Sequence, residues 1–130
     1  MQSPLQLTFR SMARSDALAA HLEQRAEKLE RFFERIISCH VVVSLVGHHH
    51  RNGDRYHFSI NIGLPGHELL VTHSSEGRSP ESAYESADRA FDEADRQLED
   101  WVRRQRDQKR DAAVGAQQTE GGATNRELAR

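Results

Sequence analysis

Hydrophobic and polar residues alternate along residues 5–10, 39–46 and 56–62, which is the pattern of half-buried β-strands. Residues 69–72, which follow the turn pair Pro65-Gly66, are expected to form a fourth strand. Two other segments repeat apolar residues at steps of three or four, which predicts helices with one apolar side. The predicted order of elements is therefore β-α-β-β-β-α. Because each element has one apolar side, we expect an α+β fold in which a four-stranded sheet packs both helices on one face.

Local sequence signals set the expected limits of these elements. Ser15 is a good N-cap for the first helix, because its hydroxyl can accept hydrogen bonds from free backbone amides. Ser79 followed by a proline is expected to begin the second helix. The pairs Asn52-Gly53 and Pro65-Gly66 are typical of turns. The last three strands are consequently expected to form an antiparallel meander.

The apolar stripes of the two helices predict most of the core. The first helix is expected to continue to Ile37. Its predicted core positions are Leu18, Leu22, Leu29, Phe32 and Ile36. The second stripe continues to Trp101, whose indole could stack on a nucleobase but is better explained as a core side chain. Because glycine and glutamine replace the pattern from Asp111 onward, we expect a folded domain at residues 1–110 and a disordered tail at 111–130.

The composition is that of a small soluble protein with no global affinity for nucleic acid. The chain has 130 residues, of which 36% are hydrophobic and 29% charged, and a formal net charge of −2. No segment approaches the roughly 18 apolar residues of a membrane span, and the first residues do not resemble a signal peptide, so we expect a cytoplasmic protein. The single cysteine, Cys39, excludes an intrachain disulfide. Any binding to RNA must come from a local concentration of positive charge.

The sequence offers few candidate catalytic or metal-binding residues. Eight histidines suggest a metal site. However, the adjacent His48, His49 and His50 cannot all face the same way in a strand, and no cysteine or carboxylate lies at ligand spacing nearby. His57 and Ser59 have no partner at the spacing of a hydrolase, and the glycines do not form a phosphate-binding loop. We therefore predict neither an enzyme nor a bound cofactor, metal or small-molecule substrate.

Two short motifs carry a family resemblance. Lys28–Ile36 matches, nearly position for position, a Lys-Leu-Glu-x-aromatic-aromatic-acid-Arg-Ile run that is typical of the ribosome hibernation-promoting factor and ribosome-associated inhibitor family. A second match is Tyr84-x-x-x-Asp88 at the start of the last helix, followed by Arg96-Gln97-Leu98. The chain therefore resembles this family over about residues 5–109, and its His-rich turn is similar to that of a divergent branch.

The resemblance implies a fold like that of the dsRNA-binding domain and a binding role without enzymatic activity. Members of the family bind the 16S rRNA of the small ribosomal subunit, in the cleft used by messenger and transfer RNA. They halt translation in this way in stressed or stationary-phase cells. Long members carry an additional C-terminal domain for ribosome dimerisation, and this chain is similar to the short members.

The charges of the first helix are sorted by sign. Lys28, Arg31 and Arg35 fall within about 60° of one another at the helical repeat of about 100° per residue. Arg25 lies beside them, and the glutamates group on another flank. Such a strip of cations can hold phosphates. A solvated helix face with weak pairs such as Glu27–Arg31 explains the same pattern.

The second helix gives a weaker indication of RNA binding. Arg89, Arg96 and Arg103 recur every seven residues, but each follows an acidic residue by four positions, which favours pairing within the helix. Glu93 and Asp100 stand where better-known family members tend to have lysine. Cations are concentrated beyond them, although the helix dipole alone favours cations near a C-terminus. The predicted RNA-binding residues are Arg25, Lys28, Arg31, Arg35, Arg89, Arg96, Arg103, Arg104 and Arg106.

The sequence leaves open two alternative functions to ribosome binding. The same fold could act as a protein-interaction module, in which the exposed sheet face or the edge of the fourth strand forms a homodimer or contacts a transcription factor such as a sigma factor. The acidic residues Glu93 and Asp100 motivate this alternative. A metal-responsive sensor based on the histidines is the third hypothesis.

Overall fold

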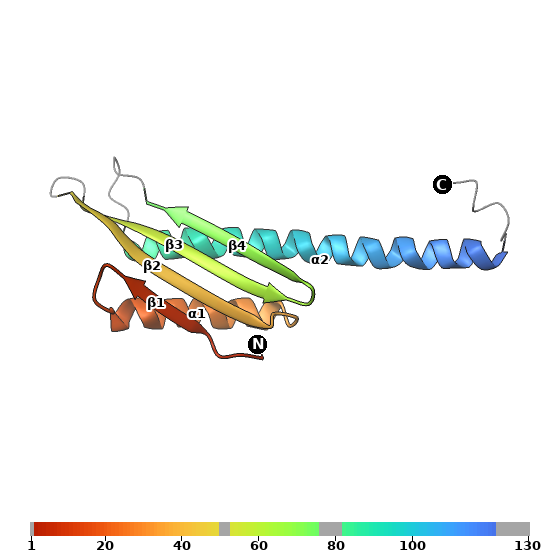
Figure 1. Cartoon of the computed structure of the whole chain (residues 1–130), viewed down its shortest axis with the longest axis horizontal. Helices are drawn as coiled ribbons and strands as arrows, with labels where there is room; N and C mark the ends of the chain where they lie inside the picture. Colours follow the sequence, from red (N-terminus) through yellow and green to blue (C-terminus); the bar gives the residue numbers. More distant parts are fainter. Residues whose placement is uncertain (1, 50–52, 76–81, 122–130) are drawn as a thin grey trace. The chain divides into compact units, whose positions relative to one another are not determined.

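The computed structural model describes residues 2–49, 53–75 and 82–121 of the chain. Its elements are β1 (Gln6–Arg10), α1 (Asp16–Phe32), β2 (Ser38–His49), β3 (Gly53–Leu64), β4 (His67–Ser74) and α2 (Ala83–Gly121) (Figure 1). Residues 1–97 form one compact unit, and residues 98–130 form a second unit into which α2 continues. The predicted order of elements is confirmed.

The four strands form one mixed sheet in the order β1-β2-β3-β4. β1 runs parallel to β2, with Leu7 opposite Val41, whereas β3 is antiparallel to both of its neighbours. A parallel pair needs a crossover connection, and α1 supplies it. The predicted meander is confirmed, because each of the last three strands is antiparallel to the next.

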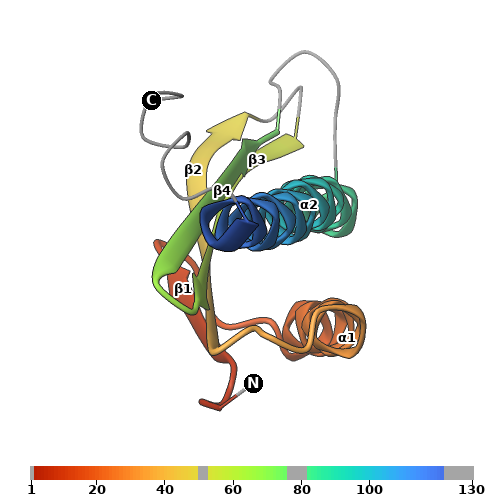
Figure 2. The same ribbon diagram turned by 90° about the vertical axis from the view of Figure 1, so that its right-hand side faces the viewer.

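The core is a layer between the sheet and the helices. In Figure 2, α1 and the first part of α2, residues 83–97, lie on the same side of the sheet. The strands contribute mainly β-branched and aromatic side chains to this layer, and the helices contribute their apolar stripes. Fully buried side chains include Leu22, Val41, Phe58, Ile60 and Phe91. The predicted α+β architecture, with both helices on one face of the sheet, is confirmed.

Neither α1 nor residues 83–97 of α2 lies on the opposite face of the sheet (Figure 2). Thr8 Oγ1 lies 2.9 Å from His40 Nε2, which joins β1 to β2. His57 Nδ1 lies 2.7 Å from Ser74 Oγ, which joins β3 to β4. This face therefore presents hydroxyl and imidazole groups, together with the exposed side chain of Leu70.

Each helix begins at a serine cap. The Leu18 N–H donates to the Ser15 Oγ at 3.2 Å, which confirms the predicted start of α1. At the start of α2, the Glu85 N–H donates to the Ser82 Oγ at 3.1 Å, and the Ser82 N–H donates to Glu85 Oε1 at 3.4 Å. These reciprocal bonds form a capping box. The cap predicted at Ser79 lies outside the described residues.

The end of α1 differs from the prediction. The helix ends at Phe32 instead of Ile37, because Ile36 leaves the helical path to enter the core, where it is 3% exposed. The Ile37 N–H then donates to the Gly63 carbonyl oxygen at 2.7 Å, which directs the chain into β2. Phe32 is 69% exposed, so its predicted core position is wrong.

α2 is longer than its apolar stripe predicted. It extends to Gly121 and has 39 residues. Residues with high helix propensity can continue a helix without burial, which the stripe alone does not reveal. Trp101 is 4% exposed, so its predicted burial is confirmed. The division into a domain at residues 1–110 and a disordered tail stays a prediction.

β2 and β3 form a longer hairpin than predicted. Each strand has 12 residues, and the ladder reaches from Ser38 opposite Gly63 to His49 opposite Gly53. The register shifts between Leu45 and Gly47, which is a β-bulge in β2. A bulge increases the local twist of a strand. Asn52, in the predicted turn, lies outside the described residues.

Candidate nucleic-acid interface

Arg25, the first of the predicted RNA-binding residues, joins α1 to α2. Its Nη1 lies 2.8 Å from Asp88 Oδ1, and its Nη2 lies 3.0 Å from Asp92 Oδ1. Nη2 also lies 3.7 Å from Asp95 Oδ2, and the guanidinium carbon lies 5.4 Å from the centre of the Phe91 ring. The Arg25 side chain is 17% exposed. Its charge is compensated by three aspartates, with which it forms what we call the Arg25 cluster, and its attraction for phosphate is reduced accordingly.

Hydrogen bonds keep this cluster ionised. His21 Nε2 lies 2.8 Å from Asp88 Oδ1, and the His21 ring packs edge-on against Tyr84 with 5.3 Å between ring centres. Burial would raise the pKa of Asp88, but hydrogen bonds from His21 and Arg25 outweigh burial and lower that pKa. Burial would lower the pKa of Arg25, but hydrogen bonds to Asp92 and Asp88 raise it. The contact between the two helices is therefore ionic in the folded protein.

Two cations and one aromatic ring are exposed together at the end of α1. Lys28 and Arg31 are both exposed. Arg31 Nη2 lies 3.5 Å from Glu27 Oε1, in a pair whose side chains are 69% and 73% exposed. Such pairs are weak, so Arg31 retains most of its capacity to bind a phosphate. Phe32 lies one helical turn after Lys28 and is 69% exposed. We call Lys28, Arg31 and Phe32 the α1 basic end.

Arg35 does not belong to this helical surface. It is exposed in the turn between α1 and β2, beyond the last residue of the helix. The helical repeat that grouped Arg35 with Lys28 and Arg31 therefore does not apply to it. A contact between Arg35 and RNA stays a prediction.

The cations of α2 within the compact unit are partly compensated. Arg96 Nε donates to Glu93 Oε1 at 3.0 Å, and Gln97 Nε2 donates to Glu93 Oε2 at 2.9 Å. The hydrogen bonds from Arg96 and Gln97 lower the pKa of Glu93 to about 2. Glu93 is therefore ionised at neutral pH and compensates Arg96. Arg89 is exposed on the same helix.

The second unit shows the same pairing and then a more open stretch. Arg103 Nη2 lies 3.1 Å from Asp100 Oδ1, three residues earlier on α2. Arg104 and Arg106 are exposed, and among the side chains described in residues 82–112 neither has an ion-pair partner. These two arginines therefore keep their positive charge available.

The structure thus separates the predicted RNA-binding residues by environment. Arg25, Arg96 and Arg103 each have a carboxylate at hydrogen-bonding distance. Lys28 and Arg31 remain exposed on α1. The strip of cations that the helical repeat suggested on the first helix is therefore reduced to Lys28 and Arg31, because Arg25 is paired with carboxylates and Arg35 lies beyond the helix.

Sequence reasoning missed two features of this surface. Phe32 was assigned to the core, but its ring is exposed. Its position one turn after the exposed Lys28 is the signal for this, and it can be used only when the end of the helix is known. The pairing of Arg25 with Asp88 was also missed, because 63 residues separate the partners. The Tyr84-x-x-x-Asp88 spacing shows that these two residues share a helix face, but it does not identify the partner.

The other candidate functional residues do not form a metal or catalytic site among the described residues. Among the described residues, no three metal-binding side chains lie close enough to share an ion. None of the helices in residues 2–49 and 82–121 combines the length and apolar character needed to cross a membrane. Cys39 is 2% exposed, and burial raises the pKa of its thiol to about 12, which makes the thiol unreactive. His50 lies outside the described residues, and the metal hypothesis stays untested.

The fold defines the class of protein, a small α+β domain with two helices on one face of a four-stranded mixed sheet. Residues 5–106 match the family described as Sigma 54 modulation protein / S30EA ribosomal protein, and the chain belongs to this family. The family resemblance inferred from Lys28–Ile36 is confirmed by this match.

Several solved structures share the fold, among them the following two. One is a ribosomal subunit interface protein from Coxiella burnetii, with 17% identity and a TM-score of 0.62, covering 75% of this chain and 96% of that protein. The other is the N-terminal domain of Protein Y from Thermus thermophilus, with 24% identity and a TM-score of 0.59, covering 74% of this chain and 94% of that domain. Comparison with curated proteins found no significant match.

Proposed function

We propose that this protein binds the small ribosomal subunit through its 16S rRNA, in the cleft for messenger and transfer RNA, and silences translation in stressed or stationary-phase cells. Membership of the S30EA ribosomal protein family over residues 5–106 is the observation that carries the proposal. A structural neighbour described as a ribosomal subunit interface protein supports it at the level of fold. The protein acts in the cytoplasm by occupying a site, without chemistry and without a cofactor.

The α1 basic end provides the groups that this contact requires. Lys28 and Arg31 can neutralise phosphates, and the release of counterions from RNA then drives association. The exposed ring of Phe32 can stack on an unpaired base, which is the usual way in which proteins hold single-stranded RNA. Arg104 and Arg106 offer further phosphate contacts from the second unit. Arg25 contributes mainly by holding the helices, since its charge is already compensated.

Co-sedimentation with purified small subunits across a salt series tests the electrostatic contact. We expect wild-type binding to weaken as salt rises. The double variant Lys28→Gln/Arg31→Gln should bind more weakly and reduce the slope of log affinity against log salt by about 1 to 2, because two phosphate contacts are lost.

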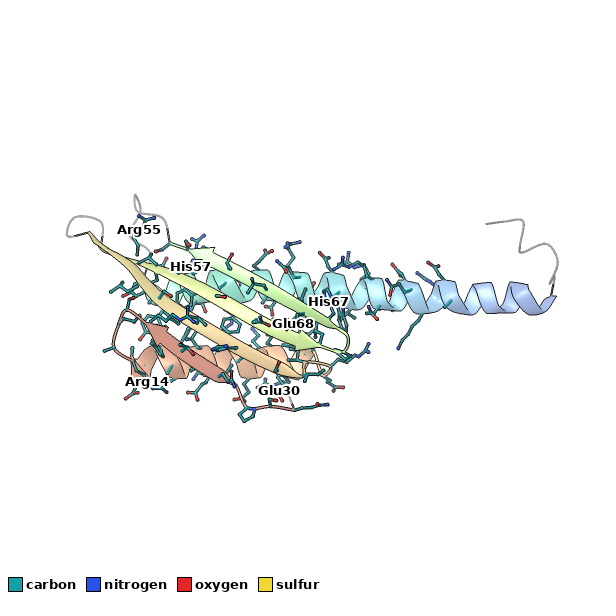
Figure 3. The ribbon with its side chains drawn as sticks, viewed as in Figure 1. Arg14, Glu30, Arg55, His57, His67 and Glu68 are labelled. Atoms are coloured by element: carbon teal, nitrogen blue, oxygen red, sulfur yellow. The ribbon has the colours of Figure 1, made fainter. Side chains whose placement is uncertain are left out.

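A matched control removes the same charge from two arginines that precede α1, one of them the last residue of β1. Arg10→Gln/Arg14→Gln has the same change in net charge, and Arg14 lies at the end of α1 opposite Glu30 (Figure 3). We expect the control to bind like the wild type. Equal losses in the two double variants would show that total charge, and not the α1 basic end, determines the affinity.

Phe32 can be tested separately from charge. Phe32→Ala should reduce the affinity about tenfold without changing the salt slope, because loss of base stacking costs roughly 1–3 kcal/mol per base. Phe32→Tyr should retain most of the affinity. Thermal unfolding should hardly change in either variant, since the ring is 69% exposed. Unchanged affinity in Phe32→Ala would remove the ring from the interface.

The compensated cations favour a second candidate function. Arg25, Arg96 and Arg103 are paired with carboxylates, which weakens any general attraction for nucleic acid. The same fold could therefore serve as a protein-interaction module that modulates a transcription factor. No binding to small subunits at low salt, together with saturable capture of a non-ribosomal protein after nuclease treatment, would favour this function.

A further inference from the structure

β4 is an edge strand of the sheet. It pairs with β3 along its whole length, and no other strand of the described residues lies on its outer side (Figure 1). The backbone N–H and C=O groups on that outer side can therefore accept another strand. In Figure 3, His67 and Glu68 mark the beginning of this edge.

The hydrogen bonds of the neighbouring ladder show which residues face outward. The Ser75 N–H donates to the Tyr56 carbonyl oxygen at 2.9 Å, and the β3–β4 register continues this pairing. In an antiparallel ladder, hydrogen-bonded pairs alternate with pairs that are not bonded. Leu69 and Val71 thus bond to β3, and the backbone groups of the residues between them point outward.

The outer edge of β4 lacks the usual protection against strand pairing. Its eight residues include no lysine, arginine or proline, and its register with β3 has no bulge. Leu70 lies on the open face of the sheet, opposite Asn61 of β3, and is 60% exposed. By contrast, β1 at the other edge has five residues and ends at Arg10. The two edges of the sheet are therefore not equivalent.

We propose that β4 pairs with β4 of a second copy of this chain, antiparallel and about a two-fold axis at Leu70. In this register Leu70 lies opposite Leu70 of the second copy, and each donates to and accepts from the other. Glu68 lies opposite Thr72, whose hydroxyl can hydrogen bond to the carboxylate. Leu69 lies opposite Val71 on the buried side. The two sheets then form one continuous sheet.

The self-complementarity of β4 is what identifies a second copy as its partner. The strand carries one acidic residue, Glu68, and the register sets it against a hydroxyl instead of another carboxylate. The exposed apolar surface of Leu70 is covered by an identical residue. An interface with these properties is isologous, so one strand supplies both halves of every contact and assembly stops at two copies. A contact confined to one strand is small, and we expect a weak dimer.

Cross-linking through introduced cysteines tests the register. Leu70→Cys places two thiols across the axis, roughly 5 Å apart between Cβ atoms, whereas Thr72→Cys places them ~14 Å apart because they are offset by four residues. The natural Cys39 is 2% exposed and its thiol pKa is raised to about 12, so it should not react. With a short bis-maleimide, Leu70→Cys should give dimers and Thr72→Cys should not. Equal cross-linking of both variants, or none in either, would overturn the proposed register.

Sedimentation equilibrium tests the dimer itself. The wild type should dimerise reversibly at concentrations up to roughly 0.5 mM, and Leu70→Lys should weaken dimerisation at least about tenfold, because two like charges would face each other. The matched control Asn61→Lys adds the same charge one strand further inside the same face. It should dimerise like the wild type, with circular dichroism confirming that both variants are folded. A wild type that remains monomeric over this range would overturn the proposal, whatever its affinity for ribosomes.

Discussion

Arg25 illustrates, at the scale of single residues, how position decides what a cation does. It belongs to the same helix as Lys28, but its guanidinium lies among the carboxylates of α2 and is 17% exposed, whereas Lys28 is exposed. An ion pair that loses one partner leaves an uncompensated charge, and the cost rises with the burial of the pair. Substitution of Arg25 should therefore change mainly the stability of the fold, and substitution of Lys28 mainly the affinity for the ribosomal subunit.

We predict that Arg25→Met lowers the free energy of unfolding by roughly 1–3 kcal/mol, because three aspartates lose their common partner. Lys28→Met should change it by less than about 0.5 kcal/mol. Urea unfolding measures both values, and co-sedimentation with small subunits should show the reverse order of effects, with the larger loss of affinity in Lys28→Met. If Arg25→Met unfolds like the wild type but no longer binds, Arg25 is an RNA contact and not a structural link.

Asp88 makes the stability depend on pH. Its pKa is lower in the folded protein than in the unfolded chain, so its contribution is present above the unfolded value, near 3.9, and is lost as pH falls through the folded value. Asp88→Asn should cost at most about 1 kcal/mol at pH 7, since the side chain is 44% exposed and solvent screens the interaction.

Urea unfolding of Asp88→Asn at pH 7 and in the acid range checks this dependence. The difference from the wild type should shrink as pH falls below the unfolded value. Glu93→Gln should show the same direction of pH dependence, because hydrogen bonds from Arg96 and Gln97 also lower the pKa of Glu93. A difference for Asp88→Asn that stays constant with pH would contradict the assignment to the ionised carboxylate.

At the scale of elements, the start of α2 depends on local hydrogen bonds. Ser82 and Glu85 satisfy each other's backbone amides in the capping box. We predict that Ser82→Ala lowers the free energy of unfolding by about 1 kcal/mol, as is usual for the loss of an N-cap. Ser3→Ala, at an exposed serine outside a helix, should have almost no effect. Equal thermal stability of the two variants would show that α2 does not need this cap.

The end of α1 shows why element boundaries are hard to predict. Phe32 and Ile36 both continue the helical repeat, so the apolar pattern alone extends the helix through them. The helix ends where it does because Ile36 is required in the core and Ile37 bonds to Gly63. Both requirements come from tertiary contacts. A local pattern therefore gives the element and its apolar side, but not its last turn.

At the scale of the whole molecule, most of the fold could be predicted, but most contacts of the candidate interface residues could not. Alternation and turn signals are local, and they led to the correct sheet, the meander and the side that carries the helices. Interactions across elements, such as that of Arg25 with Asp88, depend on how the helices pack and are invisible to a helical repeat. The exposure of Phe32 could not be predicted for the same reason, because it depends on where packing ends the helix.

The parallel pairing of β1 with β2 has a consequence for the order of folding. β2, β3 and β4 are joined by short connections, so they can associate early, whereas β1 can join only after the whole of α1 has crossed the sheet. β1, the first of the described strands to be synthesised, is then the last of them to be incorporated. As the short outer strand, it should also detach first in the native state.

Native-state hydrogen exchange can detect this step. Amides of β1 should exchange through a partial opening at a lower free energy than amides of β3, which has neighbours on both sides. Equal protection of Thr8 and Ile60 would mean that the sheet opens as one unit. Otherwise, a newly synthesised chain will expose the unpaired edge of β2 until β1 pairs with it, and the length of this interval will depend on how fast α1 forms.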